Sequence, residues 1–451
     1  MIATHTLSDV RITLPSWEEL MRVLLLEEYN TRVVVLGVMA LGLASGLIGT
    51  FLVLRKRALT GDALSHATLP GIVIAFMFMS GFGVDGKSLA GLLSGAFVFG
   101  CIGVLLIVAI RSTTRLKDDA AIGIVLSVLF GLGICLLRLA TDLPSGNSAG
   151  LSGFIFGKAA SMVASDAMVM VSLAIFVSLC TALLFKEFTV LCFDSSFGSS
   201  QGWPVLLLDT ILMILVAIVT VIALQAVGLV LAVALLIIPA ASARFWTHSV
   251  KKMLISAAII GLLSGWLGAV VSAVIPRIPT GPIIVMICGF WFLLSFIFGA
   301  DTGILKRQVQ RIQLNRKIQM QHLLRAMAEL SEGSDQQRLS LNAIVSKRSW
   351  SNAHVNSILK RAIASRHIDE VGSSEFMLTP FGTTEAMRIV RNHRLWEVYL
   401  INYADIAPSH VDRDADMIEH VLGTEMVDKL ESLLEHGEVI DSPHPLGEYH
   451  T

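Results

Sequence analysis

Long apolar runs separated by short polar stretches fill the first 300 residues of the chain. A helix needs roughly 20 apolar residues to cross about 30 Å of hydrocarbon. The pattern therefore predicts nine membrane-spanning helices, near residues 32–54, 60–80, 88–110, 119–140, 162–185, 205–224, 226–243, 253–275 and 281–299. The run 205–243 could be divided differently. Gly228 and Pro239 within it indicate a kinked or interrupted helix, which membrane folds tolerate where backbone lines a cavity.

Basic residues predict the orientation of these helices, because loops rich in Lys and Arg stay on the cytoplasmic side. They gather at one end of the predicted bundle: Arg55, Lys56, Arg57, Arg111, Arg115, Lys117, Arg244, Lys251, Lys252, Lys306, Arg307 and Arg311. With nine spans, the amino terminus lies outside and everything after residue 300 lies in the cytoplasm. Residues 1–30 precede the first span, and 15–29 within them have the amphipathic pattern of a helix at the membrane interface.

Composition supports a membrane protein. The chain has 451 residues, of which 54% are hydrophobic and 15% charged. Its hydrophobic fraction is higher, and its charged fraction lower, than in an average soluble protein. Its five cysteines lie in or beside apolar runs, and none forms a CxxC pair. Neither a disulfide framework nor a thiolate zinc site is therefore indicated.

The sequence GFGVDGKS at residues 81–88 fits the pattern of a phosphate-binding loop. Such a loop follows a buried strand and opens a helix whose amides hold the phosphate. Here the pattern joins two predicted spans on the outer face. We therefore interpret it as a glycine-rich turn and expect this chain to bind no nucleotide.

One polar stretch, TGDALSHATLPG at residues 60–71, stands inside an apolar run. On a helix, Asp62 and His66 share one face, with Ser65 and Thr68 beside them. Burying a carboxylate and an imidazole in hydrocarbon is costly, so they should face a cavity, a bundle interior or a cation. Together they suit a divalent ion such as manganese, iron or zinc. The alternative is a helix cap followed by a histidine satisfied in the interior.

The stretch VLRKRALTGDALSHATLPG at residues 53–71 resembles the signature of metal-uptake permeases of ATP-binding-cassette importers. Further similar motifs follow in the same order: LKDDAAIGIVLSVLFGLG at 116–133, LSGFIFG at 151–157, QAVGLVLAVALLIIPAASAR at 225–244 and IPTGPIIV at 278–285. The resemblance covers about residues 33–299. It implies that Asp62 and His66 meet the metal inside the membrane.

The resemblance also implies partners. These are ATP-hydrolysing subunits, a second permease chain of the same or another kind, and an extracytoplasmic metal-binding protein, in a bacterial inner membrane. The loop KEFTVLCFDSSFGSSQGWP at residues 186–204 is similar to the coupling helix that contacts the ATPase, with Phe193, Asp194 and Gly202 matching. From its residues alone, the segment could equally be a plain polar loop. Asp209 and Gln225 are further intramembrane polar groups, in a pathway or in interhelical hydrogen bonds.

After residue 300 no span-length apolar run remains, so the last third is a separate unit. Its first half is basic and predicts helices at about 316–330, 339–347 and 351–366, followed by two short strands within 368–379. This is a winged helix-turn-helix pattern, whose third helix normally enters the DNA major groove. Its outward residues Ser351, Asn352, Asn356 and Lys360 are candidate DNA contacts. The alternative is a winged helix used only for protein contact.

The acidic second half resembles the iron- and manganese-dependent repressors of the diphtheria-toxin-repressor type, through LTPFGTTEAMRIVRNHRLWE at residues 378–397 and ADMIEHVLGTEMVDKLE at 415–431. The resemblance spans about 319–445 and implies a set of regulatory metal ligands: His393, Glu397, Asp416, Glu419 and His420. Two positions depart from the family pattern. Asp412 stands where a histidine is common, and Arg325 stands where a ligand is expected, although an arginine cannot bind a cation.

The sequence thus predicts an all-α polytopic permease of the type II ABC importer class with a cytosolic winged helix and a helical metal-binding and dimerisation domain. The predicted boundaries are 1–30, 31–300 for the spans, 301–318 for a linker, 319–391 for the winged helix and 392–451 for the metal-binding domain. A divalent metal is the expected substrate and possible effector. The alternatives are a membrane-tethered or released metal-dependent repressor anchored by its spans, and a secondary transporter.

Overall fold

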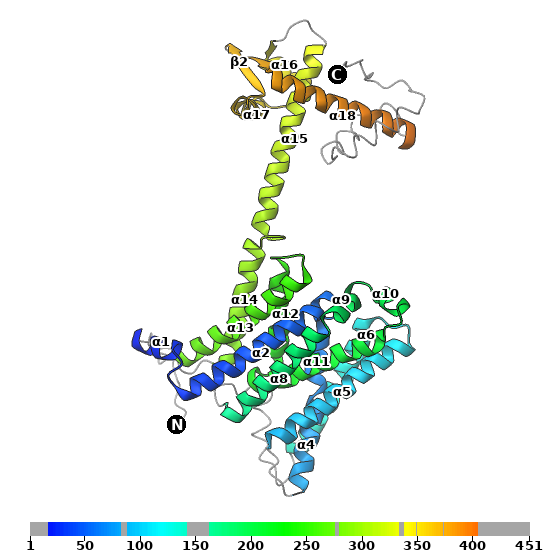
Figure 1. Cartoon of the computed structure of the whole chain (residues 1–451), viewed down its shortest axis with the longest axis vertical. Coiled ribbons are helices and arrows are strands. Elements are labelled where there is room, and N and C mark those ends of the chain that lie inside the picture. Colours follow the sequence, from blue (N-terminus) through cyan, green and yellow to red (C-terminus); the bar gives the residue numbers. More distant parts are fainter. Residues whose placement is uncertain are drawn as a thin grey trace, which may run out of the picture. The chain divides into compact units, whose positions relative to one another are not determined.

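The computed structural model of the chain describes residues 17–82, 88–141, 162–275, 279–332, 338–348, 350–372 and 374–404. Helices make up most of them (Figure 1). The chain divides into two compact units, Met1–Arg307 (unit 1) and Gln308–Thr451 (unit 2). Each unit has a hydrophobic core of its own.

Unit 1 is a bundle of apolar helices (Figure 1). In its described residues, eight segments are long and apolar enough to cross a membrane. Counting α3 and α4 together, these segments are α2 (Tyr29–Leu54), α3 (Leu59–Ala67) with α4 (Leu69–Gly81), α5 (Leu89–Thr113), α6 (Asp118–Thr141), α8 (Ala164–Leu183), α11 (Val205–Val227), α13 (Val250–Val274) and α14 (Thr280–Phe298). Eight of the nine predicted spans therefore have a counterpart of full length.

The seventh predicted span is a shorter helix. α12 (Leu229–Arg244) has 16 residues and contains Pro239. At 1.5 Å per residue it reaches about 24 Å, less than the thickness of the hydrocarbon core. Gly228 separates it from α11 at a φ of 86°, a backbone conformation that glycine adopts without steric cost. The interruption indicated by Gly228 is thus present.

The second predicted span consists of two helices rather than one. α3 ends at Ala67, Thr68 stands between the helices, and α4 begins at Leu69. Pro70 lies in the first turn of α4, where its missing N–H leaves no hydrogen bond unmade. The helix that carries Asp62 and His66 therefore ends directly after them.

Three further short helices lie in the described part of unit 1. α1 (Trp17–Leu24) occupies part of the predicted amphipathic segment, which was expected to continue to residue 29. α9 (Phe185–Phe193) and α10 (Ser195–Ser200) lie between α8 and α11, in the segment expected to be a coupling helix. Both lie at one end of the bundle, opposite α4 (Figure 1).

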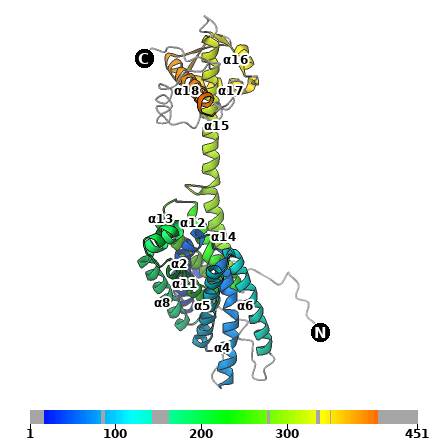
Figure 2. The ribbon, with the colours of Figure 1, turned by 90° about the vertical axis from the view of Figure 1, so that its right-hand side faces the viewer.

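Unit 2 has the predicted winged helix-turn-helix arrangement. Its elements are α15 (Ile304–Glu332), which begins in unit 1, β1 (Leu339–Ser340), α16 (Leu341–Lys347), α17 (Asn352–Ala364), β2 (Ile368–Gly372), β3 (Glu375–Leu378) and α18 (Pro380–Ala404). The strands form an antiparallel sheet in the order β1-β3-β2, in which Leu339 pairs with Phe376 and Ile368 with Leu378. α16, α17 and α18 surround the C-terminal part of α15 (Figure 2).

Three features of the chain after residue 300 differ from the predicted layout. The linker expected at residues 301–318 is helical from Ile304 onward, because α15 runs without a break into the winged helix. α18 continues through residues 391 and 392, where the boundary between two domains was expected. The first strand, β1, was not predicted, since a two-residue strand leaves no period in the sequence.

Close contact between backbones holds α2 against α13. A Cβ atom added at Gly42 would overlap the carbonyl oxygen of Gly261, and one added at Gly261 would overlap that of Gly42. Membrane helices gain much of their association energy from such small-residue packing, because lipid is as apolar as leucine.

We expect Gly42→Ala to lower the melting temperature of the purified chain, because overpacking a close interface costs about 1–3 kcal/mol. Thermal unfolding in detergent, followed by tryptophan fluorescence, measures this. Gly131→Ala is the matched control, since a Cβ there meets no described atom within 4 Å. Equal melting temperatures for the two variants would contradict the close packing.

Candidate functional site

Asp62 and His66 lie on one face of α3, as their spacing predicts. His66 Nε2 is 3.5 Å from Asp62 Oδ1, and the two side chains are 25% and 38% exposed. The imidazole packs edge-on against Phe130 of α6, with ring centroids 4.6 Å apart. Its Nδ1 atom is buried and has no hydrogen-bond partner among the described residues.

The hydroxyl groups beside this pair are already used. Ser65 Oγ donates to the carbonyl of Gly61 at 2.8 Å, and Thr68 Oγ1 donates to that of Ser65 at 2.6 Å. Their hydrogens are therefore committed to the backbone. The carboxylate of Asp62 and the imidazole of His66 remain as the groups that could hold a cation.

This pair can bind a cation only incompletely. In the described part of the chain, no group of three or more His, Cys, Asp or Glu side chains is close enough to enclose a metal ion. Manganese, iron and zinc take at least four ligands. The remaining ligands would have to be water or groups from elsewhere, and such a site releases its ion readily.

The predicted coupling segment presents an ordered polar turn between two aromatic side chains. Asp194 caps α10, accepting from the backbone N–H of Phe197 and the hydroxyl of Ser196, both at 2.8 Å. The Phe197 amide, followed by the Ser196 hydroxyl, lowers the pKa of Asp194 below its ordinary value. Phe193 and Phe197 are 65% and 54% exposed, and Gly202 has a φ of 80°.

The regulatory residues are only partly within the described chain. His393 and Glu397, one turn apart on α18, are fully buried, with Nε2 and Oε1 3.0 Å apart. Asp412, Asp416, Glu419 and His420 lie outside the described residues.

An arginine contacts this buried pair. Arg325 Nη1 is 2.8 Å from His393 Nδ1, and its Nε donates to Glu329 at 2.6 Å. Burial alone would raise the pKa of Glu329, but the charges of Arg325 and Lys347 hold it below its ordinary value. The described half of the site therefore does not fit a metal ion, because a guanidinium already lies against the imidazole.

The predicted DNA-contact residues lie at one side of α17. Val355, Ile358 and Leu359 are buried against the core. Three of the candidates, Asn352, Asn356 and Lys360, are exposed. The fourth, Ser351, caps the helix, because its hydroxyl accepts from the backbone N–H of His354 at 3.3 Å.

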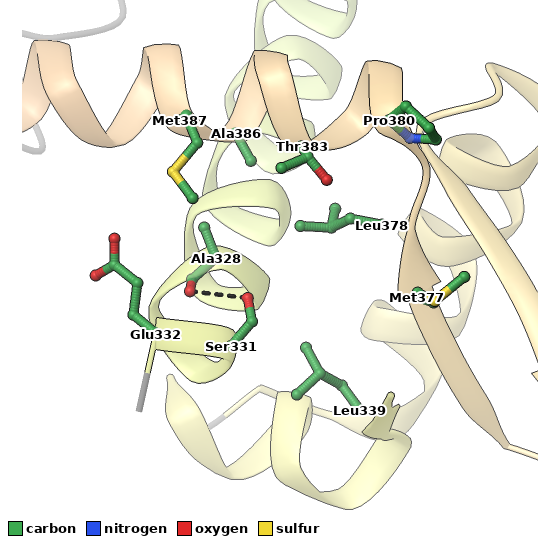
Figure 3. A pocket seen from close by; sticks show the side chains of 10 residues that line it. All are labelled: Ala328, Ser331, Glu332, Leu339, Met377, Leu378, Pro380, Thr383, Ala386 and Met387. Atoms are coloured by element: carbon green, nitrogen blue, oxygen red, sulfur yellow. Dashed lines mark hydrogen bonds between the residues drawn. The ribbon is translucent and has the colours of Figure 1, made fainter. Parts of the chain in front are cut away.

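Unit 2 also contains a cavity of about 470 Å³ between α15, α18 and the sheet (Figure 3). Its lining is mainly apolar, with Ser331 bonded to the carbonyl of Ala328 and Glu332 at the edge. Among the described residues, none of those predicted to bind metal or DNA lines it.

Comparisons with known proteins agree with both halves of this description. The sequence model of the ABC 3 transport family matches residues 27–299. That of the iron dependent repressor, metal binding and dimerisation domain, matches residues 379–445. The first match covers more than half of the chain.

Individual relatives extend the comparison. The manganese transport system membrane protein MntC of Bacillus subtilis is 34% identical over 389 residues, which cover 86% of this chain and 88% of the relative. The zinc transport system membrane protein TroC of Treponema pallidum is 40% identical over 294 residues, which cover 64% of this chain and 97% of the relative. A solved structure of PsaBC from Streptococcus pneumoniae in complex with Fab superposes with a TM-score of 0.54 at 30% identity, covering 64% of this chain and 99% of that one.

Proposed function

Because the chain belongs to the ABC 3 transport family, we propose that it is the membrane-spanning permease subunit of an ATP-driven importer of divalent metal ions. Manganese, zinc and iron form the proposed substrate class, because a carboxylate and an imidazole suit all three ions and because relatives carry the names of manganese and zinc transport proteins. Unit 2 is proposed to be a regulatory domain of the metal-dependent repressor type.

The observation that carries this proposal is the pair of Asp62 and His66 on α3. A carboxylate and an imidazole face each other at 3.5 Å within a membrane segment, with one ring nitrogen lacking a partner in the described residues. Two ligands hold a passing ion without trapping it. A transport path needs an ion that is bound loosely enough to leave, and a site with only two protein ligands and exchangeable water meets that need.

The proposed partners follow from the family and from the geometry of α9 and α10. Separate ATPase subunits would supply energy, a second permease chain would complete the path, and an extracytoplasmic binding protein would deliver the ion. The exposed Phe193 and Phe197 support α9 and α10 as the contact with the ATPase. The proposed membrane is the bacterial inner membrane, with the amino terminus outside and unit 2 in the cytoplasm.

We expect Asp62→Ala and His66→Ala each to reduce metal uptake to the level of a control without the chain, because each removes one of two protein ligands. Uptake of radioactive manganese or zinc by cells expressing the complete importer measures this, with immunoblots for the amount of chain in the membrane. Ser65→Ala is the matched control, since its hydroxyl serves only the backbone of α3. Normal uptake in both site variants would show that Asp62 and His66 do not hold the transported ion.

A second function, DNA binding by unit 2, is favoured by the exposed side of α17 in a winged helix. Asn356 could read a base edge, and Lys360 could contact phosphate. The alternative is that unit 2 senses metal and regulates transport in place without DNA.

We expect the purified full chain to select specific DNA from a random pool. Lys360→Ala should then weaken binding to all sequences and reduce the salt slope by about 1. Asn356→Ala should cost about 1–3 kcal/mol at one base pair. Fluorescence anisotropy at several salt concentrations measures both, and Arg388→Ala on α18 is the control because it removes an equal charge outside α17. If the chain selects no DNA sequence, the remaining function for unit 2 is to sense metal and regulate transport without DNA.

A further inference from the structure

A buried carboxylate in unit 1 holds three arginines together. Asp209 of α11 is 1% exposed. Its oxygens are 2.7 Å from Arg55 Nη2, 2.9 Å from Arg57 Nη1 and 2.5 Å from Arg111 Nη1. These arginines come from the end of α2, from the turn before α3 and from the last turn of α5. The sequence pattern identified the arginines only as markers of orientation.

Asp118, the first residue of α6, completes this ion cluster. It accepts from Arg57 Nε at 2.7 Å and lies 3.2 Å from Arg111 Nε. The neighbouring Cys192 adds no charge, because burial raises the pKa of its thiol to about 12. The cluster thus contains three guanidinium groups and two carboxylates, and one positive charge is in excess.

The remaining contact of Arg55 leads out of the cluster. Arg55 Nη1 donates to the carbonyl of Leu191 at 2.5 Å. Leu191 lies in the last turn of α9, where the helix dipole concentrates negative charge. Arg55 therefore joins the end of α9 to Asp209 through the two arms of one guanidinium group.

The same carboxylate connects α9 to the helix that carries the transport pair. Arg57 shares Asp209 with Arg55, and its carbonyl accepts from the backbone N–H of Thr60 in the first turn of α3 at 3.0 Å. A path of direct hydrogen bonds and short backbone thus runs from α9 through Arg55, Asp209 and Arg57 to α3, which holds Asp62 and His66.

We propose that Arg55 and Asp209 are positioning residues that transmit movement of α9 and α10 to α3, so that ATP hydrolysis by the partner changes access to the transport pair. This rests on the proposed function of the chain. Charge balance alone does not require Arg55, because Arg57 and Arg111 already match Asp209 and Asp118. Since Arg55 is not needed for charge balance, its contacts with Leu191 and Asp209 are suited to transmit movement from α9 to α11.

The test compares Arg55→Ala with the wild-type chain, both assembled with the partner ATPase and binding protein in proteoliposomes. Removing Arg55 leaves two arginines against two aspartates, so the cluster stays balanced and the chain should assemble. We expect the number of manganese ions transported per ATP hydrolysed to fall by about tenfold, while ATPase activity stays within about twofold of wild type. Arg115→Ala is the control, since this exposed arginine at the same end of the bundle lies outside the ion cluster.

Arg55→Lys separates the bridge from the charge. A lysine keeps the positive charge but lacks the planar fork that reaches Asp209 and Leu191 together. We therefore expect Arg55→Lys, like Arg55→Ala, to transport fewer manganese ions per ATP hydrolysed. Unchanged transport per ATP in either variant would overturn the proposal, and so would a proportional loss of ATPase activity and transport. A wild-type chain that does not transport would instead refute the proposed function.

A second observation, in unit 2, concerns the ring nitrogens of His393. A guanidinium group only donates hydrogen bonds, so the 2.8 Å contact makes Nδ1 of His393 an acceptor. The proton of the neutral ring is then on Nε2, which donates to Glu397 at 3.0 Å. Both nitrogens are therefore engaged, and neither offers a lone pair to a metal.

We infer that Arg325 is a built-in cation that closes the pair of His393 and Glu397 to metal ions. Its Nε bond to Glu329, which also lies 3.2 Å from Lys347, holds the guanidinium in that place. Metal sensing by unit 2 would then depend on other residues. This inference does not depend on the transport function of unit 1.

Metal stoichiometry tests the inference. We expect Arg325→Met in the full chain to bind one more manganese ion than wild type in equilibrium dialysis, because Nδ1 of His393 becomes available. Adding His393→Ala should remove that ion again. Arg394→Met is the control, since Arg394 bonds to Glu332 instead. Equal stoichiometry in Arg325→Met and wild type would overturn the inference, as would loss of an ion when His393→Ala is made in the wild-type chain.

Discussion

The architecture of unit 1 depends on how a carboxylate is compensated inside an apolar bundle. An isolated charge in such surroundings costs several kcal/mol, so Asp209 can remain ionised only with cations against it. Three arginines provide them, from segments more than 90 residues away on the amino-terminal side of the chain. A buried ion pair adds little net stability compared with apolar packing, whereas separating its partners is costly. The cluster therefore disfavours arrangements in which these helix ends do not meet. Here it holds the C-terminal ends of α2 and α5 and the starts of α3 and α6 around α11.

That arrangement places the proposed ATPase contact and the proposed transport pair only a few hydrogen bonds apart. α9 and α10, which expose aromatic side chains, lead directly into α11 and Asp209. α3 begins after Arg57 and ends after His66, where Thr68 and Pro70 separate it from α4. A short helix with its own beginning and end can shift as a unit, whereas a continuous span of the same length is held by its whole lateral packing. The break after α3 and the ion cluster before it therefore both define α3 as a separate short helix.

Much of this fold could be predicted from the sequence, because apolar length and helical period are local properties. Eight spans, the interruption at Gly228 and the winged helix all follow from such patterns. The pairing of Asp62 with His66 also follows, since four residues make one helical turn. The ion cluster does not, because it joins Asp209 to residues about 100 to 150 positions away, and an arginine near a span end reads the same whether it faces water or an acid. The departure at Arg325 was visible in the sequence, but its contact with His393 across 68 positions was not.

Comparison of the three acidic sites explains why the partly exposed pair on α3 suits a mobile ion. Asp209 has three fixed guanidinium groups, and the imidazole and carboxylate of His393 and Glu397 have Arg325 beside them. No such cationic side chain contacts Asp62 or His66 in the described residues, and Nδ1 of His66 has no partner there. An acid and an imidazole on a membrane helix gain stabilisation when a cation approaches, and here the described chain supplies none of its own. Under the proposed function, the cation that completes this site would be the transported substrate.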